Sequence, residues 1–473
     1  MRRLALIGLD CVDPGLLQGL LPSLPTLSEL VQGGTFSRLR SVDPPITIPA
    51  WMCMMTGKDP GELGVYGFRN RADRSYTGLR VASSASFSAP AIWDTLGEKG
   101  LCSVLIGVPG TYPARPVNGL LVSDFLSPGM DSDFAYPASL RERVRSLVGE
   151  YPFDVRDFRK KGKGQVLEEA CTMTRKRVEL ARALLADEKW DLFAMVEIAP
   201  DRVHHALWAD HDPLHPRHNP RGPFRDALRA YYQLLDKELA SLLSDLPSGT
   251  QVLIVSDHGA QPLRGGLALN EWLLRKGYLA LKEEPAPGAR IEELIKQGKV
   301  DWPRTLAWGE GGYYGRVFLN VAGREPEGAI PAERYEAVRE EIAAGLEAIP
   351  DADGRPIGTR VLRPEDLYRE VTGIPPDLLV YFGDLSYRSI GSLGHGAVQT
   401  RGNDTGADEA NHAPYGIFLA HPAVEGTRDR SLLEMRGLVL RHFGLGEAGP
   451  LPAYSPDEEK AVEEHLRSLG YVD

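Results

Sequence analysis

Two long amphipathic patterns alternate with two short apolar runs in the middle of the chain. Residues 166–186 and 224–246 carry apolar residues at helical spacing, and apolar runs follow them at 192–198 and 252–255. A helix that separates two consecutive strands is the usual crossover connection of a parallel sheet. The alternation therefore predicts an α/β fold built on parallel strands.

Acidic residues stand where three predicted strands end. The apolar run Leu4 to Leu9 ends at Asp10, and the two later runs are followed by Asp201 and by Ser256-Asp257-His258-Gly259. Open α/β sheets bind their ligands at the carboxyl ends of strands. Asp and His side chains together offer oxygen and nitrogen ligands to a divalent cation. Each aspartate alone could equally cap a helix, so a metal site requires that these strand ends converge.

Histidine is concentrated in one part of the chain. None of the 11 histidines precedes His204, and six lie between His204 and His258. Asp201 and His205 are spaced i, i+4, so on one helical turn they project from the same face and can hold one cation. His204 points elsewhere and is not predicted as a ligand. A surface loop is predicted to contain His211, His215 and His218.

One threonine lies at a predicted helix start. The segment Pro44 to Trp51 has prolines that favour an extended entry, followed by a helix beginning near Pro49. Thr47 would precede that helix, where free backbone N–H groups and the helix dipole favour an anion. Its hydroxyl either caps the helix or acts as a nucleophile that faces a phosphoryl group.

Composition narrows the class of protein. The chain has 473 residues, 42% hydrophobic residues and a net charge of -11, which fits a globular protein and disfavours binding to nucleic-acid polymers. No apolar run reaches the length of a membrane span. The first apolar run is interrupted at Asp10, too early for a secretory signal, and the four cysteines show no paired spacing. These features predict a cytoplasmic protein with reduced thiols and no membrane partner.

Five short motifs occur in a fixed order after the first-strand aspartate. They read P-x-T-x-P, T-G-x-x-P, P-D-x-x-x-H, S-D-H-G and N-H-x-x-x-G-I-F, and the match that they define spans about residues 4 to 420. This ordered set resembles the alkaline phosphatase superfamily. The similarity is strongest to its type I phosphodiesterase/nucleotide pyrophosphatase group and to the related predicted phosphohydrolase/phosphomutase branch.

The resemblance implies a fold, two cations and a mechanism. The implied fold is a three-layer αβα sandwich with a central, mostly parallel sheet and loop or cap insertions. Two zinc ions are implied, with manganese as the alternative. The implied reaction cleaves phosphate mono- or diesters of a small phosphorylated substrate through a covalent phospho-threonine intermediate. The residues carried over are Thr47 as nucleophile, Asp10, Asp257 and His258 at one cation, and Asp201, His205 and His412 at the other. His395 is a rival for the place of His412.

The chain departs from the nucleotide pyrophosphatase pattern near the substrate. Phe68 stands where that group has an Asn that helps to hold the phosphoryl oxygens, which favours the phosphohydrolase branch. Arg69, Asn70 and Arg324 are weak candidates for substrate contacts, and a solvated surface role is the alternative for each. Phosphodiesterase/nucleotide pyrophosphatase-type hydrolysis is favoured over a phosphomutase, which more usually carries Ser as nucleophile, and over a non-catalytic metal-binding relative. A sulfatase would require Cys-x-Pro-x-Arg, which is missing.

The predicted domain organisation is one catalytic domain with an insertion. Residues 1–450 form the catalytic domain, and an insertion at about 260–360, irregular between 285 and 312, covers part of it. A Gly-rich, polar loop is predicted at 391–408. Residues 451–473 form an amphipathic helical tail that docks either on the core or on a second subunit, so a homodimer is left open.

Overall fold

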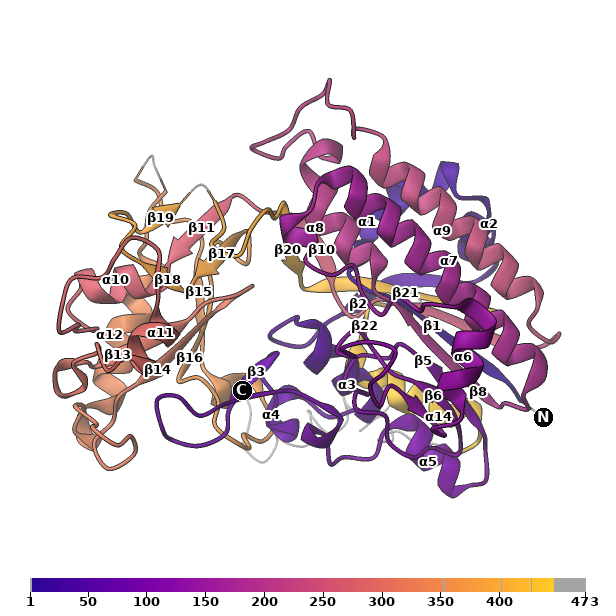
Figure 1. Cartoon of the computed structure of the whole chain (residues 1–473), viewed down its shortest axis with the longest axis horizontal. Coiled ribbons are helices and arrows are strands. Elements are labelled where there is room, and N and C mark those ends of the chain that lie inside the picture. Colours follow the sequence, from indigo (N-terminus) through magenta and orange to yellow (C-terminus); the bar gives the residue numbers. More distant parts are fainter. Residues whose placement is uncertain (1, 352–353, 401, 427, 446–473) are drawn as a thin grey trace, which may run out of the picture.

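The molecule consists of two lobes that lie side by side (Figure 1). The computed structural model describes residues 2–351, 354–400, 402–426 and 428–445. The larger lobe is built on a nine-stranded sheet, and the smaller lobe on separate two-, three- and four-stranded sheets. The predicted tail at 451–473 lies outside the described residues.

The nine-stranded sheet is mixed but has a parallel centre. Five consecutive strands, β9 to β6 in spatial order, pair in parallel, whereas β21 pairs antiparallel with both β9 and β2, and β7 pairs antiparallel with β6. The fold class predicted from the helix-strand alternation is confirmed. In spatial order the strands are β22 (Arg430–Ser431), β2 (Thr35–Arg40), β21 (Tyr415–His421), β9 (Gln251–Val255), β1 (Leu4–Leu9), β8 (Leu192–Glu197), β5 (Ser103–Ile106), β6 (Gly119–Val122) and β7 (Ala135–Tyr136).

Helices cover both faces of this sheet, which is why its central strands read as continuous apolar runs. Successive side chains of a strand point to opposite faces. Accordingly, Ala5, Ile7 and Leu9 enter one hydrophobic core, whereas Leu4 and Leu6 enter the other. The first core packs against α1 (Pro14–Leu20), α2 (Pro25–Gly33), α6 (Leu140–Val148), α7 (Lys163–Asp187), α8 (Ala199–His211) and α9 (Ala227–Ser244). The second packs against α3 (Thr47–Thr56), α5 (Ile92–Glu98) and α14 (Met435–His442).

The smaller lobe has its own hydrophobic core, which includes Trp272, Trp308 and Leu346. Its helices are α10 (Leu269–Arg275), α11 (Ile291–Lys296), α12 (Tyr335–Glu347) and α13 (Pro364–Leu367). Its strands are β11 (Gly265–Ala268), β12 (Ala289–Arg290), β13 (Ala307–Glu310), β14 (Gly315–Leu319), β15 (Arg360–Leu362), β16 (Leu378–Tyr381), β17 (Tyr387–Ile390), β18 (Ser392–Leu393) and β19 (Gln399–Thr400). The insertion predicted at about 260–360 falls within this lobe, which continues to β19.

Two antiparallel connections join the lobes. β10 (Gly259–Pro262) leaves the large sheet and pairs with β20 (Ala410–Ala413), which returns to it. A hairpin of β3 (Arg69–Arg71) and β4 (Leu79–Val81), which follows the short helix α4 (Pro60–Leu63), reaches the smaller lobe. There the ring of Tyr76 stacks on Trp302 at 3.5 Å between ring centroids.

Two local predictions are wrong. Residues 285–312 are not irregular, because they contain β12, α11 and β13. The Gly-rich segment 391–408 contains β18 and β19 rather than loop alone. In both segments the strands are only two to four residues long, too short to produce a periodic hydrophobic pattern. β12, β18 and β19 also pair with strands that are distant in sequence.

Candidate metal centre and active site

Three neighbouring strands position five of the six predicted ligands. β1 lies between β8 and β9 and runs parallel to both, so their carboxyl ends meet at one edge of the sheet. Asp10 directly follows β1, and Asp257 and His258 follow β9. After β8 the chain enters α8, whose first two turns present Asp201 and His205 toward the same edge.

The sixth ligand arrives from the far end of the sequence. His412 lies on β20, opposite Ala260 of β10, so the strand pair that joins the lobes also brings this imidazole to the sheet edge. Its ring stacks on that of His258 with 3.8 Å between centroids. His412 therefore depends on the return of the chain from the smaller lobe.

Asp10, Asp257 and His258 form the first group of candidate ligands, called here the first metal group. His258 Nε2 lies 3.2 Å from Asp257 Oδ2 and 3.7 Å from Asp10 Oδ1, and all three side chains are buried. Trp51 Nε1 donates to Asp10 Oδ2 at 2.7 Å. The indole can lie over β1 because Gly8 has no side chain: a Cβ there would lie 2.3 Å from Trp51.

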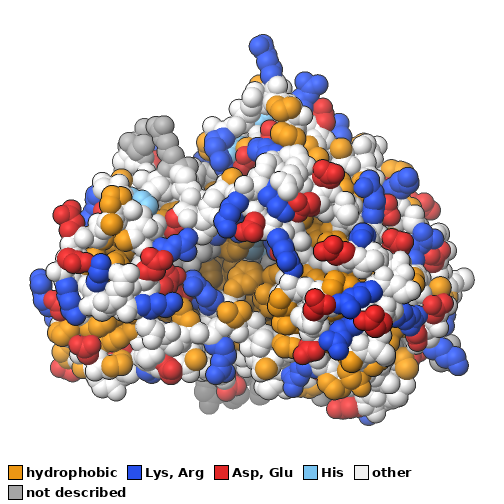
Figure 2. Space-filling view, in the orientation of Figure 1, with side chains coloured by type: hydrophobic (Ala, Val, Ile, Leu, Met, Phe, Trp, Pro, Cys, Tyr) orange, Lys and Arg blue, Asp and Glu red, His pale blue; other side chains and the backbone are white. Residues whose placement is uncertain are grey.

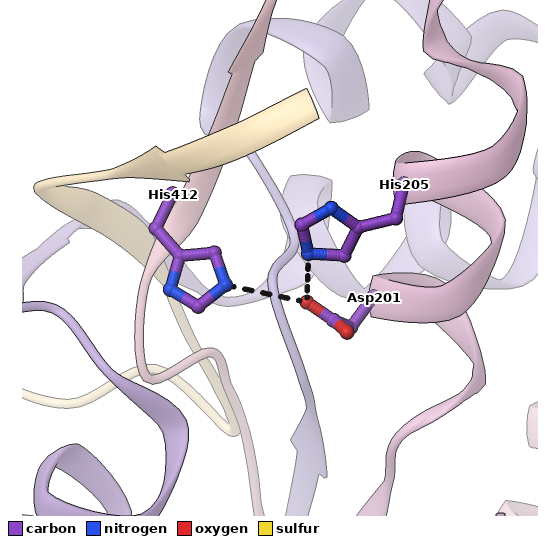
Figure 3. A group of neighbouring side chains, drawn as sticks. All are labelled: Asp201, His205 and His412. Carbon is purple, nitrogen blue, oxygen red and sulfur yellow. Dashed lines mark ion pairs between the residues drawn. The ribbon is translucent and has the colours of Figure 1, made fainter. Parts of the chain in front are cut away.

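Asp201, His205 and His412 form the second metal group (Figure 3). Asp201 Oδ1 lies 3.2 Å from His205 Nε2 and 3.7 Å from His412 Nε2. In the figure the two imidazoles approach this one carboxylate oxygen from two directions, His412 from the left and His205 from above. The other oxygen of Asp201 accepts a hydrogen bond from Arg202, which leaves Oδ1 directed at the two rings.

Five of the six candidate ligand atoms lack hydrogen-bond partners among the described residues, and the sixth, His258 Nε2, contacts the Thr47 hydroxyl. A buried polar atom without a partner is costly and needs an explanation. These atoms are Asp10 Oδ1, Asp257 Oδ2, Asp201 Oδ1, His205 Nε2 and His412 Nε2. Within each group the candidate ligand atoms lie within 4.8 Å of one another. Carboxylate oxygens and imidazole nitrogens converging in this way fit a divalent cation such as zinc, so the residues present are suited to hold one cation per group.

The second nitrogen of each ligand imidazole is occupied. His258 Nδ1 lies 3.1 Å from the Gly259 carbonyl oxygen, and His412 Nδ1 lies 2.6 Å from the Pro45 carbonyl oxygen. A hydrogen bond from Nδ1 to an oxygen acceptor fixes the proton on Nδ1 and leaves the Nε2 lone pair free for a cation. The tautomers required for metal binding are thus set by the backbone.

Asp408 plays the corresponding role for His205 and was not predicted from the sequence. Its Oδ1 lies 2.7 Å from His205 Nδ1, and its Oδ2 accepts from Arg159 Nε at 3.0 Å and from Arg388 Nη1 at 2.9 Å. These contacts keep the pKa of Asp408 below its usual range against the effect of burial. Only its position four residues before His412 could have drawn attention to it.

Electrostatics differ between the two groups. Burial, followed by repulsion from Asp10, raises the pKa of Asp257 well above its usual range. Burial and then Asp201 do the same to the pKa of Asp10. Burial would also raise the pKa of Asp201, but the positive charges of His205 and Arg202 outweigh it and hold that pKa well below the usual range. The first group therefore lacks the positive neighbours that would favour its ionised carboxylates, and a cation would supply that positive charge.

Thr47 is the first residue of α3, two residues earlier than the start predicted near Pro49. The N-cap is Ile46, so Thr47 does not cap the helix with its side chain. Its buried hydroxyl lies 3.4 Å from His258 Nε2, a ligand atom of the first metal group. Free N–H groups in the first turn of the helix favour an anion beside this hydroxyl.

The three candidate substrate residues have different surroundings. Arg69 lines the cavity between the lobes and pairs with Glu292 at 3.0 Å. Asn70 instead shapes its own loop: its side chain accepts from the Tyr66 N–H and donates to a backbone carbonyl. Arg324 makes two bonds to Asp377, at 2.7 and 2.9 Å, within the smaller lobe and does not line the cavity.

The remaining histidines lie outside the two groups. His204 projects from α8 toward Tyr232, with 2.9 Å between Nε2 and the phenol oxygen, as expected for a non-ligand. His395 bonds to Ser392 in the smaller lobe. The surface position predicted for His215 is wrong, because its side chain is buried and contacts the Glu409 carbonyl. A buried histidine in a loop requires a tertiary partner that sequence pattern does not reveal.

A mixed sheet with candidate metal ligands at its edge fits the alkaline phosphatase superfamily, to which this protein belongs. Residues 4–408 match the type I phosphodiesterase / nucleotide pyrophosphatase family, and the chain belongs to that family. This family is metal-dependent, and its activity is phosphoester hydrolysis. The matched region ends just before His412, which the structure adds to the second group.

Solved structures share the fold. Phosphonoacetate hydrolase from Sinorhizobium meliloti 1021 in complex with phosphonoformate has a TM-score of 0.61 and 14% identity, and the alignment covers 92% of this chain and 94% of that chain. Inactive murine ectonucleotide pyrophosphatase / phosphodiesterase 5 in complex with AMP has a TM-score of 0.52 and 13% identity, with 98% and 99% coverage. A comparison with curated proteins found no match. No helix in the described parts of the chain has the length and apolar character needed to cross a bilayer.

Proposed function

We propose that this chain hydrolyses small phosphate mono- or diesters with two divalent cations, zinc first and manganese as the alternative, through a phospho-threonine on Thr47. The observation that carries the proposal is the set of five buried, unpartnered donor atoms that converge in two groups beside the Thr47 hydroxyl. A purely structural cluster would satisfy these atoms with hydrogen bonds.

In this proposal each metal group holds one cation. Asp10, Asp257 and His258 would hold the cation next to Thr47, and the second metal group would hold the other. When bound, the cations would supply Lewis acidity to the phosphoryl oxygens and to the attacking hydroxyl. Among the described residues no carboxylate bonds to the Thr47 hydroxyl, and the imidazole beside it, His258 with Nε2 at 3.4 Å, is assigned to the cation in this proposal. No side chain is therefore left there as a dedicated general base.

Thr47 carries the covalent chemistry in this proposal. Its oxygen attacks phosphorus in line, the leaving oxygen departs on the opposite side, and water then cleaves the Thr47–phosphate bond. Backbone N–H groups at the start of α3 orient the phosphoryl oxygens. Phe68, which lines the adjacent cavity, offers no hydrogen bond where nucleotide pyrophosphatases have an Asn, which favours general phosphohydrolase activity over nucleotide specificity.

Turnover by the purified chain tests the proposal. The protein, dialysed free of metal and reloaded with Zn²⁺ or Mn²⁺, is assayed with bis-p-nitrophenyl phosphate, p-nitrophenyl phosphate and phosphonoacetate, the last because one structural neighbour is a phosphonoacetate hydrolase. We expect metal-dependent product release by the native chain and none above background by Thr47→Ala. The matched control is Thr77→Ala, which changes an exposed threonine in the β3–β4 turn and should keep full activity.

Two outcomes would replace the proposal. Isomerisation of a phosphorylated metabolite with poor hydrolysis of aryl esters would identify a phosphomutase. Stoichiometric metal with no turnover of any ester in a broad panel would identify a non-catalytic metal-binding protein. Isolation of phosphate on Thr47 by mass spectrometry after rapid acid quench would support the covalent route.

A further inference from the structure

The cavity between the two lobes opens beside the second metal group. It has a volume of about 500 Å³ and is lined by residues of both lobes, and Figure 2 shows the hollow with Lys and Arg side chains near its rim and hydrophobic side chains inside. Ile46, which precedes the proposed nucleophile, lines it. So does Tyr313, whose ring stacks on His412 with 4.0 Å between centroids. A substrate whose phosphoryl group reaches Thr47 would extend its remaining part into this cavity.

The lining is cationic although the chain as a whole has a net charge of -11. Four acidic residues line it: Asp154, Asp157, Glu292 and Asp404. Seven basic residues line it: Arg69, Arg159, Lys160, Arg202, Arg290, Arg316 and Arg388. Such an excess of one sign within a cleft attracts a ligand of the opposite sign.

Some of these cations are already neutralised and others are not. Arg202 is paired with both Asp154 and Asp201, and Arg316 with Glu310. Arg159 and Arg388, by contrast, share one carboxylate, that of Asp408. Arg69 is paired with Glu292, so among these arginines the uncompensated charge lies with Arg290 and with the Arg159–Arg388 pair.

Arg290 has the least compensated charge. It lies on β12 in the smaller lobe, is exposed, and forms no ion pair or side-chain hydrogen bond within the described residues. Lys160, from the larger lobe, is paired only with Asp157, and both side chains of that pair are largely exposed, so water screens the pair and a ligand can compete for the cation. Together Arg290 and Lys160 supply cationic donors from both lobes.

The rest of the lining is aromatic rather than polar. Phe68, Phe125 and Phe158 line the cavity together with Tyr313 and Tyr314. Apolar walls with a few convergent charged groups are typical of sites for compact organic ligands. An organic ligand with a charged end group therefore fits this lining better than a bare inorganic ion does.

We propose that this cavity is an anion subsite, so that the preferred substrates carry a second anionic group, a carboxylate or a second phosphate, on the part of the molecule beyond the phosphoryl group. This inference rests on the proposed function and narrows its substrate class. Arg290 and Lys160 contact the second anion, and the aromatic walls enclose the group that links it to the phosphoryl group.

A pair of isosteric substrates tests the subsite. 4-Carboxyphenyl phosphate and 4-carbamoylphenyl phosphate have the same shape and differ in the charge of the distal group. We expect the KM of the metal-loaded protein to be about tenfold lower for the carboxylate than for the carbamoyl compound. The double variant Arg290→Gln, Lys160→Gln should reduce this ratio to about twofold or less. 1,4-Phenylene bisphosphate shows whether phosphate serves as the second anion as well. The control is Arg229→Gln, an exposed arginine on α9 that does not line the cavity.

A binding measurement separates failure of the subsite from failure of the proposed function. 4-Carboxyphenylphosphonate and 4-carbamoylphenylphosphonate, which are not esters, are titrated calorimetrically into the zinc-loaded protein. Equal affinity for both, or a preference that survives the double substitution, overturns the subsite even if esters are hydrolysed. A charge preference that the double substitution removes, in a protein that hydrolyses no ester, retains the subsite and overturns the proposed function.

Discussion

The two metal groups have the same number of ligands but are built from different parts of the fold. The first group takes its three side chains from the ends of two adjacent parallel strands, β1 and β9. The second takes two from α8 and one from β20, which returns from the smaller lobe. The first group is therefore assembled by the central sheet alone, whereas the second is complete only when both lobes are in place.

The charges of the two metal groups also differ. The first group has two carboxylates and one imidazole, and no Arg or Lys pairs with either carboxylate within the described residues. The second has one carboxylate, paired with Arg202, and two imidazoles, one oriented by Asp408. We infer that the first group depends on its cation to relieve repulsion, whereas the second depends on neighbouring side chains to keep its geometry.

Substitution of one carboxylate in each group gives the largest contrast. Asp257→Asn and Asp201→Asn should each lower turnover by on the order of 10³-fold, because each removes a charged ligand from a site that stabilises the transition state. In metal-free protein the two should diverge. Asp257→Asn should raise the free energy of unfolding by roughly 1–2 kcal/mol, since it removes repulsion with Asp10. Asp201→Asn should lower it by roughly 2–3 kcal/mol, since Arg202 loses a buried partner.

Urea denaturation in the presence of a chelator measures this divergence. Activity with added metal and metal content per chain are recorded for the same variants. A fall in stability of equal size for both metal-free variants would contradict the electrostatic difference between the groups. Glu197→Gln is not a suitable control because Glu197 is itself buried and paired, so an exposed change such as Asp226→Asn is used.

Asp408→Asn sharpens the comparison because it acts on one group only. An amide can still contact His205 Nδ1 but lacks the charge that orients and polarises the ring, so affinity for the second cation should fall by about 10–100-fold. Affinity for the first cation should stay unchanged. Metal titration followed calorimetrically gives both affinities in one experiment. An equal loss of affinity for both cations would show that Asp408 supports the whole edge of the sheet and not the second group alone.

His204→Gln gives the smallest expected effect and separates acid sensitivity of the fold from protonation of the ligands. Burial lowers the pKa of His204 from 6.5 to about 3. Because the folded-state pKa is depressed, this imidazole supports the fold fully above pH 6.5, and the support is lost as pH falls toward 3. Between pH 7.5 and 5.5 the contribution of His204 to the free energy of unfolding should fall by about 1.4 kcal/mol.

The free energy of unfolding of His204→Gln and of the native chain is measured in chelator at pH 7.5 and at pH 5.5. Between these pH values the variant should lose about 1.4 kcal/mol less than the native chain. The comparison of the two proteins cancels the contribution of the ligand histidines, which both retain. An identical pH dependence for both proteins would show that His204 is protonated without cost in the folded state, in contrast to its buried position against Tyr232.

Much of the fold and of the ligand set could be predicted from the sequence because both leave local patterns. The central strands are apolar on both faces, and the helices between them are amphipathic, so β1, β8 and β9 and the helices α7 and α9 were located within a few residues. Ligands that follow such strands share an edge by geometry alone. The strand β2 was missed, because its alternating burial gives only a short and weak pattern.

Side chains whose surroundings come from distant segments were predicted least well. Arg324 looked like a surface or substrate-binding arginine, but the fold brings Asp377 to it. His215 looked exposed, but the segment at Glu409 covers it. In each case the partner is more than fifty residues away in sequence, so no local pattern contains the information.

The sequence by itself determined the class of fold, the order of the motifs and the identity of the side chains able to hold cations, because strand and helix periodicity and ligand chemistry are properties of short segments. Only the tertiary structure decided that Asp408 orients His205 and that cations of both lobes face one cavity. Those features depend on distances between residues up to several hundred positions apart, and chain packing alone sets such distances.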